Sequence, residues 1–234
     1  MIPINNNILQ LPVRKSTIIY EREDAVKRLK DLGLTIEFLQ RVLAKGVKYQ
    51  TEKPVNAPAL EKNLGLWSGT ITALRDELCP IGWQKDDKFG FNKTFLPGKY
   101  AIAVSSGDEN VGTQLNPQTK NTKGAVSEAA VEVNNAQQLT LLDFHSYDYV
   151  ETNNKYSLED MQHWFLLYYY DKHILKGELS LPNYFDESMQ KITGWSERIL
   201  LPPLTPEEIH QINYPQLSPL CNNSEEEIII TRKE

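Results

Sequence analysis

Residues 101–136, AIAVSSGDENVGTQLNPQTKNTKGAVSEAAVEVNNA, decide the fold of this chain. The apolar run at 101–104 predicts a buried strand, and the spacing of apolar residues over Ala125–Ala136 predicts a helix. Between them lies a long polar segment rich in Gly, Asn, Ser and Thr. A loop between the carboxyl end of a strand and the amino end of a helix is a common place for ligand contacts. The 105–124 loop is therefore the first candidate site.

Three amphipathic helices are expected upstream of this segment. Apolar spacing predicts a helix over Glu21–Leu32 and another after Thr35, which has the chemistry of an N-cap, with Gly46 ending or fraying it. A two-proline linker follows at Thr51–Pro58. The third helix carries an apolar stripe with steps of three and four residues: Leu64, Trp67, Ile71, Leu74 and Leu78. The three helices should form an N-terminal helical layer.

Short strands dominate the rest of the chain. The segment His163–Tyr170 is aromatic and predicts a buried strand, which returns as a hairpin strand over Ile174–Leu181 that Pro182 stops. After a loop over Asn183–Thr193, the segment Trp195–Leu201 should form an edge strand. Further strands are expected at Trp83–Asp87, Phe89–Phe95 and Tyr100–Val104, and Gln137–Tyr149 could end a helix or start a strand.

Helices followed by hairpin-connected strands predict an α+β fold, with the N-terminal helical layer packed on a mainly antiparallel or mixed sheet and one further helix. Residues 1–20 should form an irregular arm and residues 21–204 a single domain. The tail, residues 205–234, begins with the pattern of a capping box, Thr205 with Glu208.

Composition excludes several classes of protein. The 40% apolar and 24% charged residues are ordinary for a globular protein, and a net charge of −6 disfavours a protein that coats nucleic acid by bulk attraction. No apolar run approaches the roughly 20 residues that span a bilayer, and the start does not resemble a secretory signal. Two distant cysteines, Cys79 and Cys221, argue against a disulfide framework or a structural zinc site. A cytoplasmic protein without a membrane partner is expected.

The 105–124 loop has the chemistry of an anion site. Its candidate ligand contacts are hydroxyl, backbone and ammonium groups of Ser105, Ser106, Gly107, Lys120 and Lys123. A Walker A loop is excluded because Thr113 and Gln114, rather than Lys and Ser or Thr, follow Gly112. Asp108 would repel a phosphate unless a divalent cation bridged the two. The alternative interpretation is a long solvated loop with a polar surface.

A second hypothesis is a metal-dependent phosphodiesterase or nuclease that uses Asp108, Asp143, His145 or Glu178 as catalytic groups. In an extended chain Asp143 and His145 share a face, which suits a general base or half of a metal site. The order Lys176-x-Glu178 is the reverse of the Glu-x-Lys of such nucleases, and alternation of this kind is typical of a solvated strand face. A cofactor, a divalent cation, is required only under this hypothesis.

A third hypothesis is a non-catalytic structural subunit of a larger complex, which docks through the helical layer at Leu64–Leu78 or through a sheet edge. The aromatic run 164–170 could stack bases, although its interleaved leucines favour a core strand.

Five phrases resemble those of an uncharacterised family of bacterial proteins without assigned activity, associated with mobile elements or defence islands. They are ALRDELCPIGW (73–83), AIAVSSGDENVGT (101–113), PQTKNTKG (117–124), GELSLP (177–182) and WSERILLPP (195–203). The resemblance implies a role beside nucleotide or nucleic-acid chemistry and transfers no catalytic residue. The leading expectation is a cytoplasmic binding or accessory protein whose 105–124 loop holds a nucleotide, a nucleic-acid phosphate or an anionic group of a protein partner.

Overall fold

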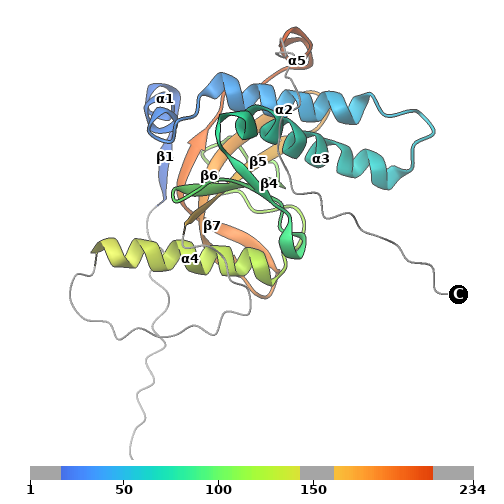
Figure 1. The fold of residues 1–234 in the computed structure, drawn as a ribbon. Coiled ribbons are helices and arrows are strands. Elements are labelled where there is room, and N and C mark those ends of the chain that lie inside the picture. Colours follow the sequence, from blue (N-terminus) through green and yellow to red (C-terminus); the bar gives the residue numbers. More distant parts are fainter. Residues whose placement is uncertain (1–16, 143–160, 213–234) are drawn as a thin grey trace, which may run out of the picture.

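The computed structural model describes residues 17–142 and 161–212. Seven strands form one sheet in the order β1-β7-β6-β5-β4-β3-β2, and helices cover both of its faces (Figure 1). The strands are β1 Ile18–Tyr20, β2 Gln84–Asp86, β3 Lys93–Leu96, β4 Tyr100–Ser106, β5 Gln162–Tyr170, β6 Leu175–Asp186 and β7 Lys191–Leu200. The helices are α1 Arg22–Asp31, α2 Ile36–Thr51, α3 Ala59–Leu78, α4 Ala125–Leu142 and α5 Pro206–Gln211, with 3₁₀ turns η1 Cys79–Ile81 and η2 Lys88–Gly90. The predicted α+β class is confirmed.

The sheet is mixed. Strands β4 and β5 pair in parallel, as do β1 and β7, while the other four neighbouring pairs are antiparallel. The parallel β4–β5 pair matters most for the site, because α4 and the long loop connect these two strands and because parallel strands end at the same edge of a sheet.

Helices α1, α2 and α3 share one buried cluster with the sheet face formed by residues such as Ile102, Trp164 and Leu179. Thr35 caps α2 as predicted, since its Oγ1 accepts the Phe38 N–H at 3.1 Å. Gly46 does not end α2, because the helix continues to Thr51. A Cβ at Gly46 would lie 2.1 Å from Thr70 Oγ1, so the glycine allows α2 and α3 to pack closely.

The opposite sheet face is covered by α4 and by the 105–124 loop. Val111 from the loop and Ala130 from α4 are buried against Phe165 and Trp195. Asn134 ties α4 to two strands, since its amide donates to the carbonyls of His163 and Pro182 and its Oδ1 accepts the His163 N–H. This buried amide fixes the helix that follows the loop.

Several details of the strands differ from expectation. Of the strand expected over Phe89–Phe95, only the part from Lys93 forms β3, because η2 occupies Lys88–Gly90, and β4 continues through Ser105 and Ser106, the first two residues of the expected loop. Pro182 does not stop β6, because a shift in the pairing with β7 accommodates it and the strand continues to Asp186. Most of the expected loop over Asn183–Thr193 is therefore strand, with a turn between Asp186 and Lys191. Strand β7 is not at the edge of the sheet, since β1, the end of the expected irregular arm, pairs with it. The capping box of α5, Thr205 with Glu208, is confirmed.

Candidate functional site

The two ends of the 105–124 loop meet where β4 and β5 end. Ser106 lies beside Tyr168 in the parallel register, and the Gly107 N–H donates to the Tyr168 carbonyl at 2.9 Å. The Lys120 N–H donates to the Ser106 carbonyl at 3.0 Å, and Gly107 pairs with Thr119. Hydrogen bonds therefore hold the first and last parts of the loop together at the carboxyl edge of the parallel pair.

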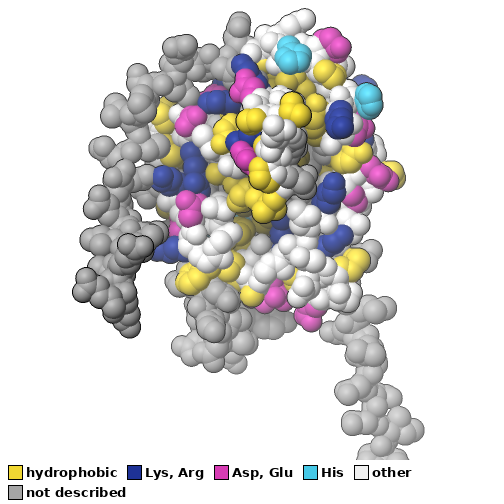
Figure 2. All heavy atoms as spheres, turned by 90° about the vertical axis from the view of Figure 1, so that its right-hand side faces the viewer, with side chains coloured by type: hydrophobic (Ala, Val, Ile, Leu, Met, Phe, Trp, Pro, Cys, Tyr) yellow, Lys and Arg dark blue, Asp and Glu magenta, His cyan; other side chains and the backbone are white. Residues whose placement is uncertain are grey.

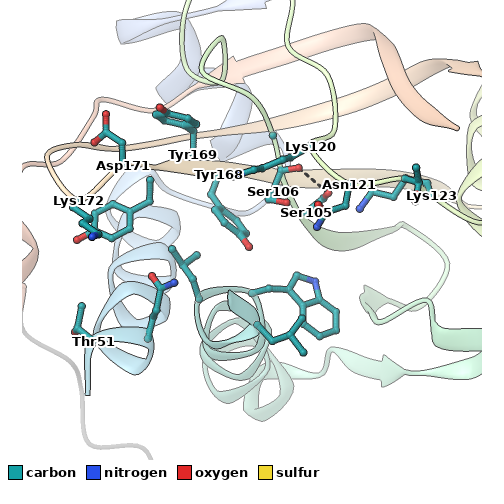
Figure 3. A pocket seen from close by; sticks show the side chains of 17 residues that line it. Thr51, Ser105, Ser106, Lys120, Asn121, Lys123, Tyr168, Tyr169, Asp171 and Lys172 are labelled. Atoms are coloured by element: carbon teal, nitrogen blue, oxygen red, sulfur yellow. Dashed lines mark hydrogen bonds between the residues drawn. The ribbon is translucent and has the colours of Figure 1, made fainter. Parts of the chain in front are cut away.

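A hollow of about 1120 Å³ opens at this edge, between the loop ends and the helical layer (Figure 3). All five candidate contacts line it: Ser105, Ser106, Gly107, Lys120 and Lys123. Its other walls come from the loop end (Asn121, Thr122), from β5 and the following turn (Tyr168, Tyr169, Tyr170, Asp171, Lys172), from α2 (Gln50, Thr51) and from α3 (Leu64, Leu66, Trp67). Ligands of α/β sheets bind in crevices at this kind of edge.

The hollow is locally basic. Three lysines line it, Lys120, Lys123 and Lys172, against one carboxylate, Asp171. Lys123 and Lys172 lie at opposite ends of the hollow (Figure 3). The Asp171 carboxylate already accepts the N–H groups of His173 and Ile174 at 2.9 Å each, and these bonds lower its pKa. Positive charge is thus spread along the wall rather than neutralised within it.

Lys123 differs from the other two lysines. Its residue is only partly exposed, and removal of the amine from water lowers its pKa from 10.5 to about 8. Its backbone N–H donates to the Gln190 carbonyl at 2.7 Å, which fixes the residue on the β6–β7 turn. Within residues 17–142 and 161–212, no carboxylate forms an ion pair with this amine.

An apolar and aromatic wall faces the lysines. Tyr168 is buried, which raises the pKa of its hydroxyl, and that hydroxyl shares a hydrogen bond with the Ser106 side chain. The Trp67 indole donates to the Val104 carbonyl at 3.0 Å, which fixes its ring at the end of β4. Leu64 is 47% exposed and lines the hollow, so it departs from the core stripe that the sequence predicted, whereas Leu66 is buried.

The middle of the loop packs against the sheet. Its anchor is an ion pair between Glu178 and Arg198 that is almost completely buried, with side chains 0% and 1% exposed. Arg198 donates to the loop carbonyls of Thr113 and Leu115 at 2.9 Å each, and Glu178 accepts the Gly112 N–H at 2.8 Å. Gly112 has φ of +70°, which favours glycine. The middle of the loop is therefore packed, whereas its two ends line the hollow.

The candidate catalytic residues do not converge in the described structure. The Glu178 carboxylate is engaged by Arg198, Ser180 and Gly112, and it does not line the hollow. Asp108 accepts the Asn110 N–H at 3.2 Å in a local turn. Asp143 and His145 lie outside the described residues. Within residues 17–142 and 161–212, no three His, Cys, Asp or Glu side chains lie close enough together to hold a metal ion.

The source of positive charge also differs from the expected one. The sequence predicted that the amino end of the helix after the loop would add to the positive charge of the lysines, but the part of the loop that lines the hollow ends at Lys123, and α4 begins at Ala125. Lysine side chains and hydroxyls, rather than the helix terminus, face the hollow. The sequence did not indicate that the end of β5 and Lys172 belong to the site, because the aromatic run was interpreted as core and β5 was expected to pair in a hairpin. The parallel pairing of β4 with β5 is what brings the end of β5 and Lys172 to the hollow.

The face of the molecule at the right of Figure 1 is not uniformly basic (Figure 2). On the side of the molecule at the right of Figure 1, side chains of both charges surround hydrophobic ones (Figure 2). None of the helices in the described part of the chain is both long and apolar enough to cross a membrane.

Comparisons of this chain with protein-family models, with curated proteins and with solved structures found no match.

Proposed function

We propose that the hollow at the carboxyl ends of β4 and β5 binds a small organic anion, with phosphate as the preferred group, and that the chain is a binding or accessory protein. The observation that carries this proposal is the ratio of three lysines to one aspartate around a hollow of about 1120 Å³. Pockets for small molecules usually have about 300–1,000 Å³, so a nucleotide-sized ligand is of the right scale.

The chemistry of the walls supports the same class of ligand. Hydroxyls of Ser106 and Thr122 and the amide of Asn121 lie beside the lysines and can donate to phosphate oxygens. The exposed Leu64 and the ring of Trp67 form an apolar wall that an anion alone would leave uncovered. A ligand with both an anionic and an apolar part, such as a nucleotide, fits both walls.

Thermal unfolding with a panel of ligands tests the proposal. Inorganic phosphate, nucleoside mono- and triphosphates and short oligonucleotides should stabilise the protein, and the matched nucleoside without phosphate should do so less. A ligand at a hundred times its Kd adds about 2.7 kcal/mol to the free energy of unfolding. The Lys120→Ala/Lys123→Ala double variant should lose this stabilisation, because it removes two of the three cations.

The control is Lys30→Ala, which removes an exposed lysine of α1 that does not line the hollow and should keep the full response. Absence of stabilisation by every anion in the panel contradicts the proposal. So does equal stabilisation of the wild type and the double variant, because the anion would then bind elsewhere.

A further inference from the structure

Lys123 combines three properties that suit a reactive amine. It lines a hollow of about 1120 Å³, its backbone is fixed by a hydrogen bond to the Gln190 carbonyl, and its amine has no ion-pair partner among the described residues. Figure 3 shows its side chain directed toward Asn121 and Ser105, inside the hollow. A lysine amine that is desolvated in a pocket can act as a nucleophile toward carbonyl groups.

We infer that Lys123 forms a covalent imine with the carbonyl group of an anionic aldehyde or ketone that binds in this hollow. The lone pair of the amine attacks the carbonyl carbon, and a carbinolamine forms. Loss of water then gives the imine: the carbonyl oxygen leaves as water with two protons, both of them originally on the amine nitrogen, so no oxidant or reductant is required. This inference rests on the proposed function, because an anionic group must hold the ligand while its carbonyl reaches Lys123.

The positions of the charges assign the two ends of such a ligand. Lys172 lies at the far end of the hollow from Lys123, and Lys120 extends from the loop end between the two in Figure 3. These two amines can hold the anionic group and leave the third amine for the carbonyl. The hydroxyls of Tyr168 and Ser106, which are hydrogen-bonded to each other, lie on the β-strand wall and can contact the carbonyl oxygen.

The protonation of Lys123 agrees with this role. Desolvation lowers its pKa to about 8. Burial is the one cause of this lowered pKa. The other charged groups around Lys123 do not contribute to the shift: Lys120, Asp171 and Lys172 of the hollow, and Glu187 and Lys191 of the β6–β7 turn. At pH 8 about half of such amines are unprotonated, against roughly 0.3% for a lysine of ordinary pKa. An amine of this kind reacts at a pH where surface lysines do not.

Labelling with pyridoxal 5′-phosphate, an aromatic aldehyde that carries a phosphate, tests the inference. The imine absorbs in the near ultraviolet and visible range, and borohydride reduces it to a stable amine that peptide mass spectrometry locates. At pH 8 Lys123 should be labelled at least about tenfold faster than Lys30, because far more of its amine is free base. The rate should reach half of its maximum near pH 8. Lys123→Met should remove this fast labelling. Lys120→Met should retain it but require a higher concentration of the aldehyde.

Labelling that spreads over exposed lysines at similar rates, or a Lys123 rate that still climbs between pH 9 and 10, overturns the inference. A parallel experiment with pyridoxal, which lacks the phosphate, distinguishes failure of this inference from failure of the proposed function. Fast labelling of Lys123 by both aldehydes at equal rates, unaffected by inorganic phosphate, upholds the reactive amine and contradicts anion binding. Stabilisation by phosphate ligands without any adduct at Lys123 contradicts the amine and leaves anion binding in place.

Discussion

Glu178, on the strand under the loop, and Lys123, at the end of the loop, are both ionisable side chains shielded from water, but they differ in whether their charge is paired. Glu178 is paired with Arg198 and accepts hydrogen bonds from Ser180 and the Gly112 backbone. Lys123 has no such partner in the described part of the chain, and its pKa falls instead. A buried charge that is fully paired holds a structure together, whereas an unpaired one keeps its chemistry available. The middle of the loop is thus its anchor, and its two ends form the site.

Removal of one member of the anchoring pair should have the largest effect. Arg198→Leu leaves the Glu178 carboxylate buried without its cation and takes the donor from the carbonyls of Thr113 and Leu115. Loss of one partner from a buried pair costs about 3–5 kcal/mol. Unfolding by urea should show this loss in the free energy of unfolding.

The matched control for this variant is Lys45→Ala, which breaks an ion pair with Asp76 whose side chains are 35% and 42% exposed. An exposed pair contributes about 0–1 kcal/mol, so the control should change the free energy of unfolding little. If Arg198→Leu cost no more than Lys45→Ala, the loop would not depend on the buried pair.

A neutral anchor on the same sheet face should have an intermediate effect. Asn134→Leu removes three hydrogen bonds that tie α4 to His163 and Pro182. Because uncharged groups are left without their partner, the expected loss is about 2–3 kcal/mol, less than for the ion pair. The neighbouring Asn135→Ala removes one partly buried bond to the Asn183 carbonyl and should cost under about 1 kcal/mol in the same urea experiment. A loss for Asn134→Leu equal to that of Asn135→Ala would contradict the anchor.

The helices could be predicted from the sequence because their causes are local. The apolar spacing of α1 to α3, the Thr35 cap and the capping box of Thr205 with Glu208 all lie within a few residues. The predictions were wrong where a contact between residues far apart in the sequence determines the local structure. The sequence predicted that Gly46 ends or frays a helix, but close packing against Thr70 of α3 is what requires the glycine there. Pro182 appeared to end a strand, but the pairing with β7 shifts around it.

The residues of the site likewise fall into those that the sequence could group and those that only the fold brings together. Ser105 and Ser106 at the end of β4 and Lys120 and Lys123 in the loop that follows lie within one short stretch of sequence, so the sequence could group them, and all of them line the hollow. Lys172, Tyr168 and Leu64 join them only through the parallel β4–β5 pairing and the packing of α3, which no local pattern encodes. The ion pair was missed for a similar reason, since Arg198 lies opposite Ser180, two residues along the neighbouring strand from Glu178. A glutamate between Gly177 and Leu179, in a strand with apolar neighbours, was the available indication of a buried partner.

The smallest effect, with the sharpest pH dependence, should come from Lys123. Its pKa is about 8 in the folded protein and 10.5 as the ordinary value of the unfolded chain. Between these values the unfolded state binds more protons, so the stability of the wild type should rise with pH from about 8 to about 10.5. Below pH 8 both states are protonated, and the cost of burying the charge is present in full.

Lys123→Met removes that charge and keeps a side chain of similar length. We expect the variant to be more stable than the wild type by on the order of 1 kcal/mol at pH 7, with the advantage shrinking as the pH rises toward 10. Lys120→Met, at an exposed lysine of the same hollow, should differ from the wild type by less than about 0.5 kcal/mol at every pH. Urea unfolding of the three proteins between pH 7 and pH 10 measures both differences. An advantage of Lys123→Met that stayed constant over this range would mean that folding does not lower the pKa of the amine. An advantage that grew would mean that the amine is charged and paired when folded, and Lys123 would then belong with Glu178 and Arg198 as an anchor.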